Sequence, residues 1–423
     1  MQLFAETKCH AAVAFRTVLK CGILVAGRMR QRRYLAILMR KTALSFTVLI
    51  AFAVFTIHAA TPSPSSEPSA KPAPPPSRAV IQAAIKEGFA RQTQALTDRV
   101  HLIWRSRGST DAPFEGNSIV IEQKEGLVVV DAGGAPVSGA NIVAQIKAMS
   151  KKPVRYLIYT HYHGDHNLGA GEFLRAWPGL TIISTEATRR NMLGPAMDYI
   201  KTYGKAHEEM VQYAGKAATD PQLPQNLRDK WAQAARVGVG MIEAYKDLKA
   251  YPATITFTDR LTLNDEIAPV EIMFLGKANT DGDAVIWAPK QRVLASGDIV
   301  VNPIPYSSAS FPSEWIGVLE KLKGFEFAYL IPGHGQIQRD RVYLDKLIGL
   351  LTEIRDKVTP LAKQGLTVEE IRKQVDIEPM LAAFAGTDRW DRAQMKNFFF
   401  GAIIPNAMKE AKGDPIVQGH DGG

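Results

Sequence analysis

Cysteine is almost absent from this chain of 423 residues. Its two cysteines, Cys9 and Cys21, both lie near the N-terminus, so the rest of the sequence has none. That part can form no disulfide, offers no thiolate nucleophile and supplies no sulfur ligand. Any metal that it binds must be held by nitrogen and oxygen atoms.

An excess of charge is also missing from most of the chain. The formal net charge is +9, but residues 1–60 contain nine basic residues and one acidic residue, which leaves the remainder at only +1. A nearly neutral body gives no electrostatic basis for binding a phosphate backbone, so we expect no nucleic-acid partner. The hydrophobic content of 46% is typical of a globular protein with a full core.

Residues 1–60 have the pattern of an upstream extension followed by an export signal. A basic start at 39–41 precedes an apolar run over 42–57, which small residues close at Ala59 and Ala60. This order is typical of a cleaved signal peptide. A membrane anchor is the alternative, because the run is near the lower length limit for a span. We favour cleavage, which predicts a periplasmic or secreted protein with no stable membrane insertion afterwards.

The sequence beyond this signal divides into a linker, a main domain and a C-terminal part. Seven prolines among Ser and Ala predict a disordered linker over 61–78. Residues 79–340 are expected to form the main domain. Within it, 188–251 shows no strand pattern and predicts a helical insertion, which serves as a lid, a substrate wall or a structural brace. Residues 341–423 predict a helical extension packed on the domain, with a capping box over Thr367–Glu370.

Strands and helices alternate along the main domain. A helix is expected from residue 79 to about 96 and another over 140–150. Alternation of this kind predicts sheets covered by helices. Several apolar runs are followed directly by polar groups, which can therefore converge on one rim of a sheet. The predicted strands are 100–104, 118–122, 127–131, 154–159, 271–275, 284–287, 292–295 and 328–331.

Histidine is concentrated at one point of the sequence. Three of the nine histidines, His161, His163 and His166, fall with Asp165 within six residues, directly after the apolar run 154–159. Imidazole and carboxylate groups bind borderline divalent metals such as zinc. The alternative is an ordinary polar loop, in which a third of all histidines would coincide by chance. The cluster therefore predicts a metal site.

Two further groups complete this prediction from the ends of later strands. His334 adds an imidazole, and Asp298 has two oxygens with which it can bridge two metals. Two metals that share a water lower its pKa and stabilise a developing oxyanion, which predicts hydrolysis of a carbonyl or related centre. The candidate ligands so far are His161, His163, Asp165, His166, Asp298 and His334.

Together these motifs resemble the metallo-β-lactamase superfamily. The pattern His-x-His-x-Asp-His is matched in full at 161–166, and Gly297-Asp298 and Pro332-Gly333-His334-Gly335 follow in the right order. The likeness spans roughly 100–335. It implies an α/β (α+β) fold, the αββα sandwich, with metals at the edge between two sheets. It also implies one or two zinc ions per chain, or other divalent metals.

Asn279 departs from the family pattern, because the family normally has a histidine in this segment. An amide oxygen is a weaker zinc ligand than imidazole. The resemblance then implies a first metal on His161, His163 and Asp298, with Asn279 as a weak or outer partner. The second metal keeps its full set of Asp165, His166, Asp298 and His334. A labile first metal, a working mononuclear centre and an inactive centre all remain open, and His207 is the alternative imidazole.

The predicted function is an exported metal-dependent hydrolase acting on a small molecule. A metal-bound hydroxide would cleave an ester-, lactone-, thioester- or β-lactam-like bond, with Asp165 as the catalytic residue that orients or deprotonates the water. Asp298 resembles members that hydrolyse thioesters, lactones and other esters, whereas export fits β-lactamases. The alternatives are a true β-lactamase and, because of Asn279, a weakened or non-catalytic metal-binding protein. The oligomeric state is not predicted.

Overall fold

Two β-sheets lie at the centre of the fold. The computed structural model describes residues 75–105 and 115–419. The extension and export signal predicted over 1–60, and all but the end of the linker predicted over 61–78, lie outside the described residues. Among the described helices, none is long and apolar enough to cross a bilayer.

The first sheet contains seven strands in the order β1-β2-β3-β4-β5-β6-β7. The strands from β1 to β4 pair antiparallel, and those from β4 to β7 pair parallel. Parallel neighbours need crossover connections, which the intervening helices provide. The strands are β1 (Gln92–Ala95), β2 (Val100–Trp104), β3 (Ser118–Glu122), β4 (Leu127–Val130), β5 (Val154–Ile158), β6 (Thr181–Thr185) and β7 (Ile255–Phe257).

The second sheet contains five strands in the order β12-β11-β10-β9-β8. Only β11 and β12 pair parallel within it. All nine residues of β11 are buried, as expected for a strand covered on both faces. The strands are β8 (Arg260–Leu263), β9 (Val270–Phe274), β10 (Ala284–Ala288), β11 (Val293–Val301) and β12 (Tyr329–His334).

The apolar faces of the two sheets meet in a shared core. Val128 and Ile158 of the first sheet are buried in one cluster with Ile272, Ile286 and Ile331 of the second. Each fully buried side chain of this kind stabilises the fold by roughly 1.5–3 kcal/mol relative to an exposed one. The sheets are therefore held face to face by ordinary hydrophobic packing.

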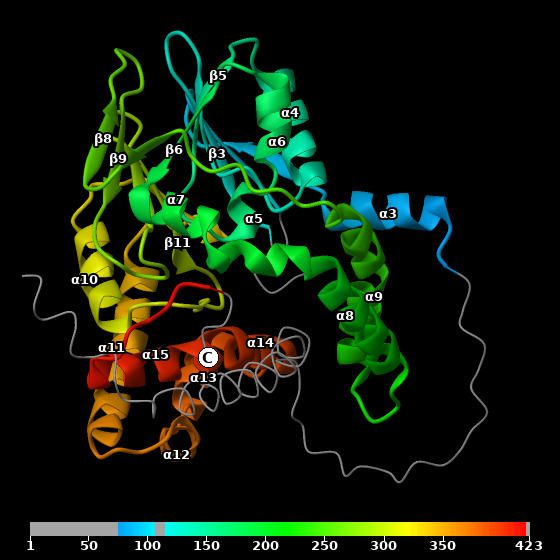
Figure 1. The fold of residues 1–423 in the computed structure, drawn as a ribbon, viewed down its shortest axis with the longest axis vertical. Coiled ribbons are helices and arrows are strands. Elements are labelled where there is room, and N and C mark those ends of the chain that lie inside the picture. The colour runs from blue at the N-terminus through cyan, green and yellow to red at the C-terminus, as the bar shows by residue number, and fades with distance from the viewer. Residues whose placement is uncertain (1–74, 106–114, 420–423) are drawn as a thin grey trace, which may run out of the picture. The chain divides into compact units, whose positions relative to one another are not determined.

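Helices cover the outer faces of both sheets (Figure 1). On the first sheet these are α4 (Pro136–Met149) and α6 (Ala170–Ala176), which bury Ile142 and Phe173. On the second sheet they are α10 (Pro312–Lys323) and α11 (Val342–Lys363). This order of layers is an αββα sandwich, so the fold class predicted from the sequence is confirmed.

Two helical segments are added to the sandwich. Between β6 and β7 the chain forms α7 (Glu186–Leu193), η1 (Pro195–Lys201), α8 (Tyr203–Thr219) and α9 (Gln225–Ala244). After α11 it forms α12 (Val368–Gln374), α13 (Glu378–Ala385), α14 (Arg389–Met395), the π-helical η2 (Lys396–Phe400) and α15 (Gly401–Lys412). The predicted capping box is present at the start of α12.

These two additions contact each other through a pair of tryptophans. Trp390 of α14 packs edge-on against Trp231 of α9, with ring centroids 4.9 Å apart. Both side chains are almost fully buried in one small cluster with Leu227 and with Ala214 of α8. The insertion and the C-terminal extension are thus joined by a hydrophobic contact of their own.

The helix predicted from residue 79 to about 96 is wrong in its second half. The helix α3 spans Arg78–Gly88, with the Ser77 hydroxyl accepting from Val80 N at its start. Gln92–Ala95 instead forms the edge strand β1, paired with β2. This strand is largely exposed and polar, so its sequence carries no apolar alternation that distinguishes it from a helix end.

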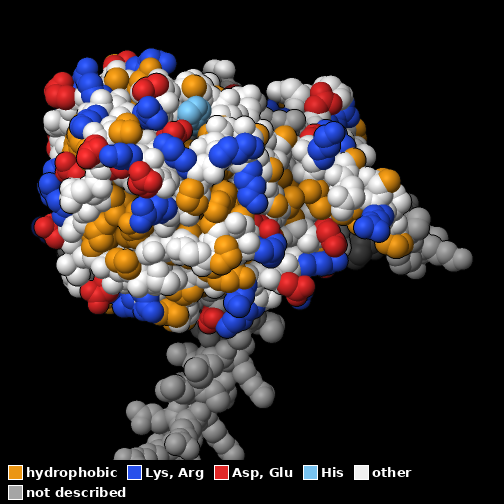
Figure 2. Space-filling view, turned by 90° about the horizontal axis from the view of Figure 1, so that it is seen from above, with side chains coloured by type: hydrophobic (Ala, Val, Ile, Leu, Met, Phe, Trp, Pro, Cys, Tyr) orange, Lys and Arg blue, Asp and Glu red, His pale blue; other side chains and the backbone are white. Residues whose placement is uncertain are grey.

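The described surface mixes both signs of charge. On the face shown in Figure 2, acidic and basic side chains are interspersed with apolar ones. A stripe of a single sign, as nucleic-acid binding requires, is not seen among the described residues on this face. The view agrees with the near-neutral charge of the chain beyond residue 60.

Candidate metal centre

The candidate ligands come from the loop after β5, from β11 and from the end of β12, at one edge of the sandwich. The loop after β5 carries His161 and His163 into the short helix α5 (Gly164–Asn167), while Asp298 lies within β11 and His334 ends β12. Backbone hydrogen bonds between segments hold this edge together. Ala284 N donates to Thr160 O at 2.7 Å, and Asn117 N donates to Gly333 O at 2.7 Å.

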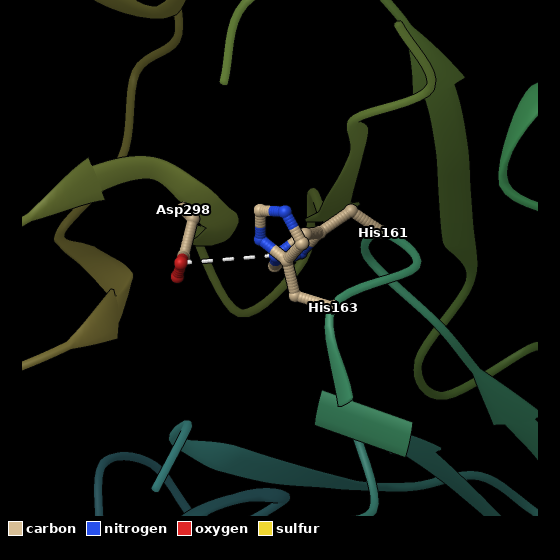
Figure 3. Close-up of side chains that lie close together, drawn as sticks. All are labelled: His161, His163 and Asp298. Atoms are coloured by element: carbon tan, nitrogen blue, oxygen red, sulfur yellow. Dashed lines mark hydrogen bonds and ion pairs between the residues drawn. The ribbon is translucent and has the colours of Figure 1, made fainter. Parts of the chain in front are cut away.

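The first group consists of His161, His163 and Asp298, all buried (Figure 3). His161 Nε2 lies 2.9 Å from His163 Nδ1 and 3.7 Å from Asp298 Oδ2. The two imidazoles come from one loop and the carboxylate faces them from β11. Two nitrogens and one oxygen converge here, which is a donor set suited to a divalent metal such as zinc.

The second group consists of Asp165, His166 and His334. Asp165 Oδ2 lies 2.8 Å from His334 Nε2 and 3.3 Å from His166 Nε2. The two imidazole nitrogens are 3.2 Å apart. Asp165 is the most exposed member, with 22% of its side chain accessible, so this carboxylate lies on the solvent side of the centre.

Asp298 of the first group also lies close to the second group. Its Oδ2 faces His161, whereas its Oδ1 lies 3.2 Å from His166 Nε2 and 3.5 Å from His334 Nε2. The Oδ1 atom is buried and accepts no hydrogen bond among the described residues. A buried carboxylate oxygen without a donor is costly unless a cation compensates it, so this arrangement fits two metals bridged by Asp298.

Asp131 determines which nitrogen each of two histidines presents to the centre. Its Oδ2 accepts from the Thr160 hydroxyl at 2.8 Å and lies 2.7 Å from His166 Nδ1, which therefore carries the proton. Because the Thr160 hydroxyl proton points to Asp131, the Thr160 oxygen accepts from His161 Nδ1 at 3.0 Å. The Nε2 atoms of both histidines are thus left as acceptors that can bind metal.

The electrostatics of the centre favour bound positive charge. Burial would lower the pKa of His166, but carboxylates, led by Asp165 and Asp298, raise it well above its ordinary value. Burial would raise the pKa of Asp165, but His166 and His334 hold it well below its usual range. Burial, followed by the charge of His166, lowers the pKa of His161. Three carboxylates, those of Asp131, Asp165 and Asp298, lie within 3.3 Å of His166, and divalent cations would balance their negative charge.

Replacing Asp131 by asparagine is expected to weaken metal binding and to lower kcat/KM, each by roughly 10- to 100-fold. Asparagine has one acceptor oxygen instead of two, so it cannot accept from Thr160 N on one side and from the Thr160 hydroxyl and His166 on the other, and the histidine tautomers are held less firmly. The backbone at position 131 has a φ of 60°, which asparagine tolerates, so the loop conformation is retained. Metal affinity is measured by competition with a chromophoric chelator.

The matched control is Asp281→Asn, which removes a loop carboxylate of the same kind. Asp281 bonds to Arg190 and Asn191 at 2.6 Å, and not to a histidine. This variant should keep the metal affinity of the native protein. Equal losses in the two variants would show that Asp131 has only a general structural effect.

Glycines let the loops of the centre approach one another closely. A Cβ at Gly333 would lie 1.9 Å from Asp298 Oδ1, and a Cβ at Gly297 would lie 2.6 Å from Thr160 Cβ. Gly297 also has a φ of 51°, in the left-handed region that favours glycine. The glycines that precede Asp298 and His334 in the sequence are therefore required by the packing of the centre.

The sequence offers Asn279 as a weak or outer partner of the first metal and His207 as an alternative imidazole. Asn279 is fully buried in the loop after β9, and neither amide atom has a hydrogen-bond partner among the described residues. His207 is held in α8 by a 2.8 Å bond between Nδ1 and Tyr203 O. Burial lowers the pKa of His207 to about 4, so it stays neutral. His207 is not part of either metal group.

Sequence reasoning missed three residues that support the centre. Thr160 directly precedes His161, and a hydroxyl at that point was the available signal. Arg91 and Glu115 form an ion pair with no exposed side-chain surface, and Arg91 Nη1 also donates to Gly116 O. A Cβ at Gly116 would lie 2.5 Å from the His166 ring, so this pair fixes the backbone beside that ligand. No local pattern pointed to it.

The chain belongs to the metallo-beta-lactamase superfamily, whose family model matches residues 111–334. This match includes all six residues of the two metal groups. The resemblance inferred from the sequence motifs is therefore confirmed.

Among individual proteins, the chain is similar to a linear primary-alkylsulfatase from Pseudomonas sp. (strain ATCC 19151). The two are 25% identical over 288 residues, which cover 63% of this chain and 51% of that protein. The 2,4-dinitroanisole O-demethylase subunit alpha from Nocardioides sp. (strain JS1661) is 23% identical over 228 residues, covering 53% of each. The chain thus spans about half the length of the curated relatives that it matches.

A solved structure shows a similar fold. A stereoselective inverting sec-alkylsulfatase from Pseudomonas sp. superposes with a TM-score of 0.52 at 15% identity, over 78% of this chain and 52% of that one. At this level of identity the likeness concerns the fold alone.

Proposed function

We propose that this protein is an exported, zinc-dependent hydrolase that cleaves small ester-type substrates. The observation that carries the proposal is the position of Asp298, whose two oxygens face two separate groups of buried ligands. A bridging carboxylate between two nitrogen-rich groups is the arrangement that a two-metal hydrolytic centre needs. Export is proposed from the signal pattern within residues 1–60.

The candidate residues would have separate roles in the reaction. His161, His163 and Asp298 would hold the first metal, and the second group together with Asp298 would hold the second. Bound divalent metals supply Lewis acidity and lower the pKa of a coordinated water. Asp165, at the solvent side of the centre, would orient the attacking water through its carboxylate.

The role of Asp165 follows from its charge state. His166 and His334 hold its pKa well below the usual range although burial opposes this, so the carboxylate stays ionised at neutral pH. An ionised carboxylate of low pKa accepts a hydrogen bond but stores a proton poorly. We therefore assign Asp165 to orienting the water and to metal binding, with any proton passed on to solvent.

The substrate class is proposed from the chemistry of the site and from the relatives. The centre suits carboxylic esters, thioesters and lactones, whose cleavage develops negative charge on oxygen. Two relatives are named as an alkylsulfatase and an O-demethylase, so sulfate esters and aryl methyl ethers are the next candidates.

Purified protein loaded with zinc is expected to turn over at least one member of a panel of these bonds. A carboxylic ester is the expected first positive, and removal of metal with a chelator should abolish its turnover. Re-addition of zinc should restore it, because the ligands are fixed by the fold and its hydrogen bonds. Turnover that survives full removal of metal would contradict the proposal.

The same panel distinguishes the alternatives. Nitrocefin turnover that is abolished by a chelator and exceeds ester turnover would favour a true β-lactamase, which the exported state would suit. Protein that binds no zinc and hydrolyses no member of the panel would favour a non-catalytic protein of this fold. Asn279 is the feature that favours the last outcome.

A further inference from the structure

The metal centre has an aromatic wall beside its first ligand group. The ring of Tyr306 lies edge-on to His163, with centroids 5.9 Å apart and an interplanar angle of 88°. Tyr306 belongs to the connection between β11 and α10. The four residues that follow it, 307–310, are buried, whereas Tyr306 itself remains partly exposed. An aromatic side chain that stays partly exposed beside a metal ligand is placed to contact a substrate.

The C-terminal extension holds this connection in place. Ser307 N donates to Phe398 O at 2.9 Å, and Gln418 Nε2 donates to Ala309 O at 2.9 Å. Asn406 Nδ2 donates to Ser308 O. Three separate points of the extension thus bond to consecutive residues of one loop. The position of the Tyr306 ring therefore depends on residues nearly a hundred positions later in the chain.

The extension also adds an aromatic ring to the wall. The ring of Phe398 lies 6.4 Å from that of Tyr306, tilted by 35°. Phe398 is part of the π-helical turn η2, a conformation that often marks functional positions because it redirects side chains. Its neighbours Phe399 and Phe400 are buried in the core, whereas Phe398 is partly exposed. The π-turn therefore separates two core rings from one that faces Tyr306.

The helical insertion supplies aromatic rings on the side of the second ligand group. Tyr199 Oη accepts from Gly164 N at 2.9 Å, which fixes the insertion to the start of α5, the helix that carries Asp165. The ring of Tyr203 packs on Tyr199 at 5.4 Å and on Tyr245 at 4.8 Å. Tyr203 is partly exposed and contacts the start of α5 through Tyr199.

We propose that Tyr306 and Phe398, beside the first ligand group, and Tyr203, next to α5, line the pocket for an apolar group of the substrate. This inference rests on the proposed function and narrows it to esters with an alkyl or aryl group of several carbons. Neutral aromatic rings bind such groups by excluding water from both surfaces. Short polar esters would leave the same rings in contact with water, so the rings would not increase the affinity for them.

The pocket is tested by binding of straight-chain carboxylates, from acetate to hexanoate, to the zinc-loaded protein. Such carboxylates resemble the acid product of ester cleavage, so binding measured by calorimetry needs no turnover. Affinity for the native protein is expected to rise roughly threefold to fourfold per added methylene. In Phe398→Ala and in Tyr306→Ala the gain in affinity per methylene should become much smaller, while the affinity for acetate stays within about twofold of the native value.

Phe384→Ala is the matched control. Phe384 is a half-buried aromatic residue of the same extension, but it packs against Tyr343, away from His163. The Phe384→Ala variant should keep the native increase in carboxylate affinity with chain length. If Phe398→Ala does not fold, Tyr306→Ala still decides the question, since it alters only the loop side of the wall.

The outcomes separate this inference from the proposed function. Protein that holds no zinc overturns both. Protein that holds zinc but binds acetate and hexanoate equally well overturns the pocket and leaves the metal centre standing. If carboxylate affinity increases with chain length as in the native protein in both Phe398→Ala and Tyr306→Ala, the proposed pocket is also overturned, because the apolar group would then bind elsewhere.

Discussion

Replacing Asp298 by alanine is expected to remove metal from both groups and to lower kcat/KM by on the order of 10³-fold or more. The first group loses its only carboxylate, which lies 3.7 Å from His161. The second group loses the oxygen that lies 3.2 Å from His166. Because one side chain serves both metals, a single substitution should act on both at once. Metal content per chain after dialysis and ester kinetics measure the two effects.

Asp298→Asn provides the graded comparison. It keeps one oxygen of similar position and replaces the other by an amide nitrogen, which cannot bind metal. Metal content should then fall less than in the alanine variant, with one group retained. Alanine protein that keeps the metal content of the native protein would show that Asp298 does not bridge. Thermal unfolding of the metal-free proteins checks that the variants still fold.

Replacing Asn279 by histidine is expected to raise zinc content from about one metal per chain toward two. An imidazole is a stronger zinc ligand than an amide oxygen and would complete the first group. The affinity for the first metal should increase on the order of 10- to 100-fold, the scale of effects seen around metal sites. Zinc stoichiometry and competition with a chelator measure the change.

Asn279→Leu is the matched control for this substitution, because it keeps a similar size and removes the amide. If the native amide contributes to the first metal, leucine should weaken that metal further while the second metal stays bound. The native amide is buried without a partner among the described residues, which costs stability unless a ligand satisfies it. Unchanged stoichiometry in Asn279→His would contradict the assignment of this position.

The sequence was most informative where the signal is local. The apolar runs placed strands β2 and β3 at their observed bounds, since a buried strand is recognisable from a few consecutive residues. The metal site at 161–166 could likewise be predicted from local sequence, because the ligand types and their spacing lie within one short segment. The polar edge strand Gln92–Ala95 was missed, because it has no buried face to give a pattern.

Long-range contacts could not be predicted from the sequence. Nothing near Phe398 indicates that it lies against Tyr306, and these residues are brought together only by the packing of the extension. The same holds for Arg91 and Glu115, whose pairing depends on where α3 ends. Asn279 was recognised as a departure, but its burial without partners required coordinates. The type of a ligand can be recognised from a short stretch of sequence, whereas the residues that surround it in the fold cannot.

The contact between Trp231 and Trp390 has a consequence for how this protein can change over evolutionary time. The two helical additions share one buried interface. If either is replaced by a segment that lacks its tryptophan, the indole ring of the other addition becomes exposed to water. Substitutions in α9 and α14 should therefore be inherited together. Recombination that respects this contact would have to move both additions, or neither, onto another sandwich.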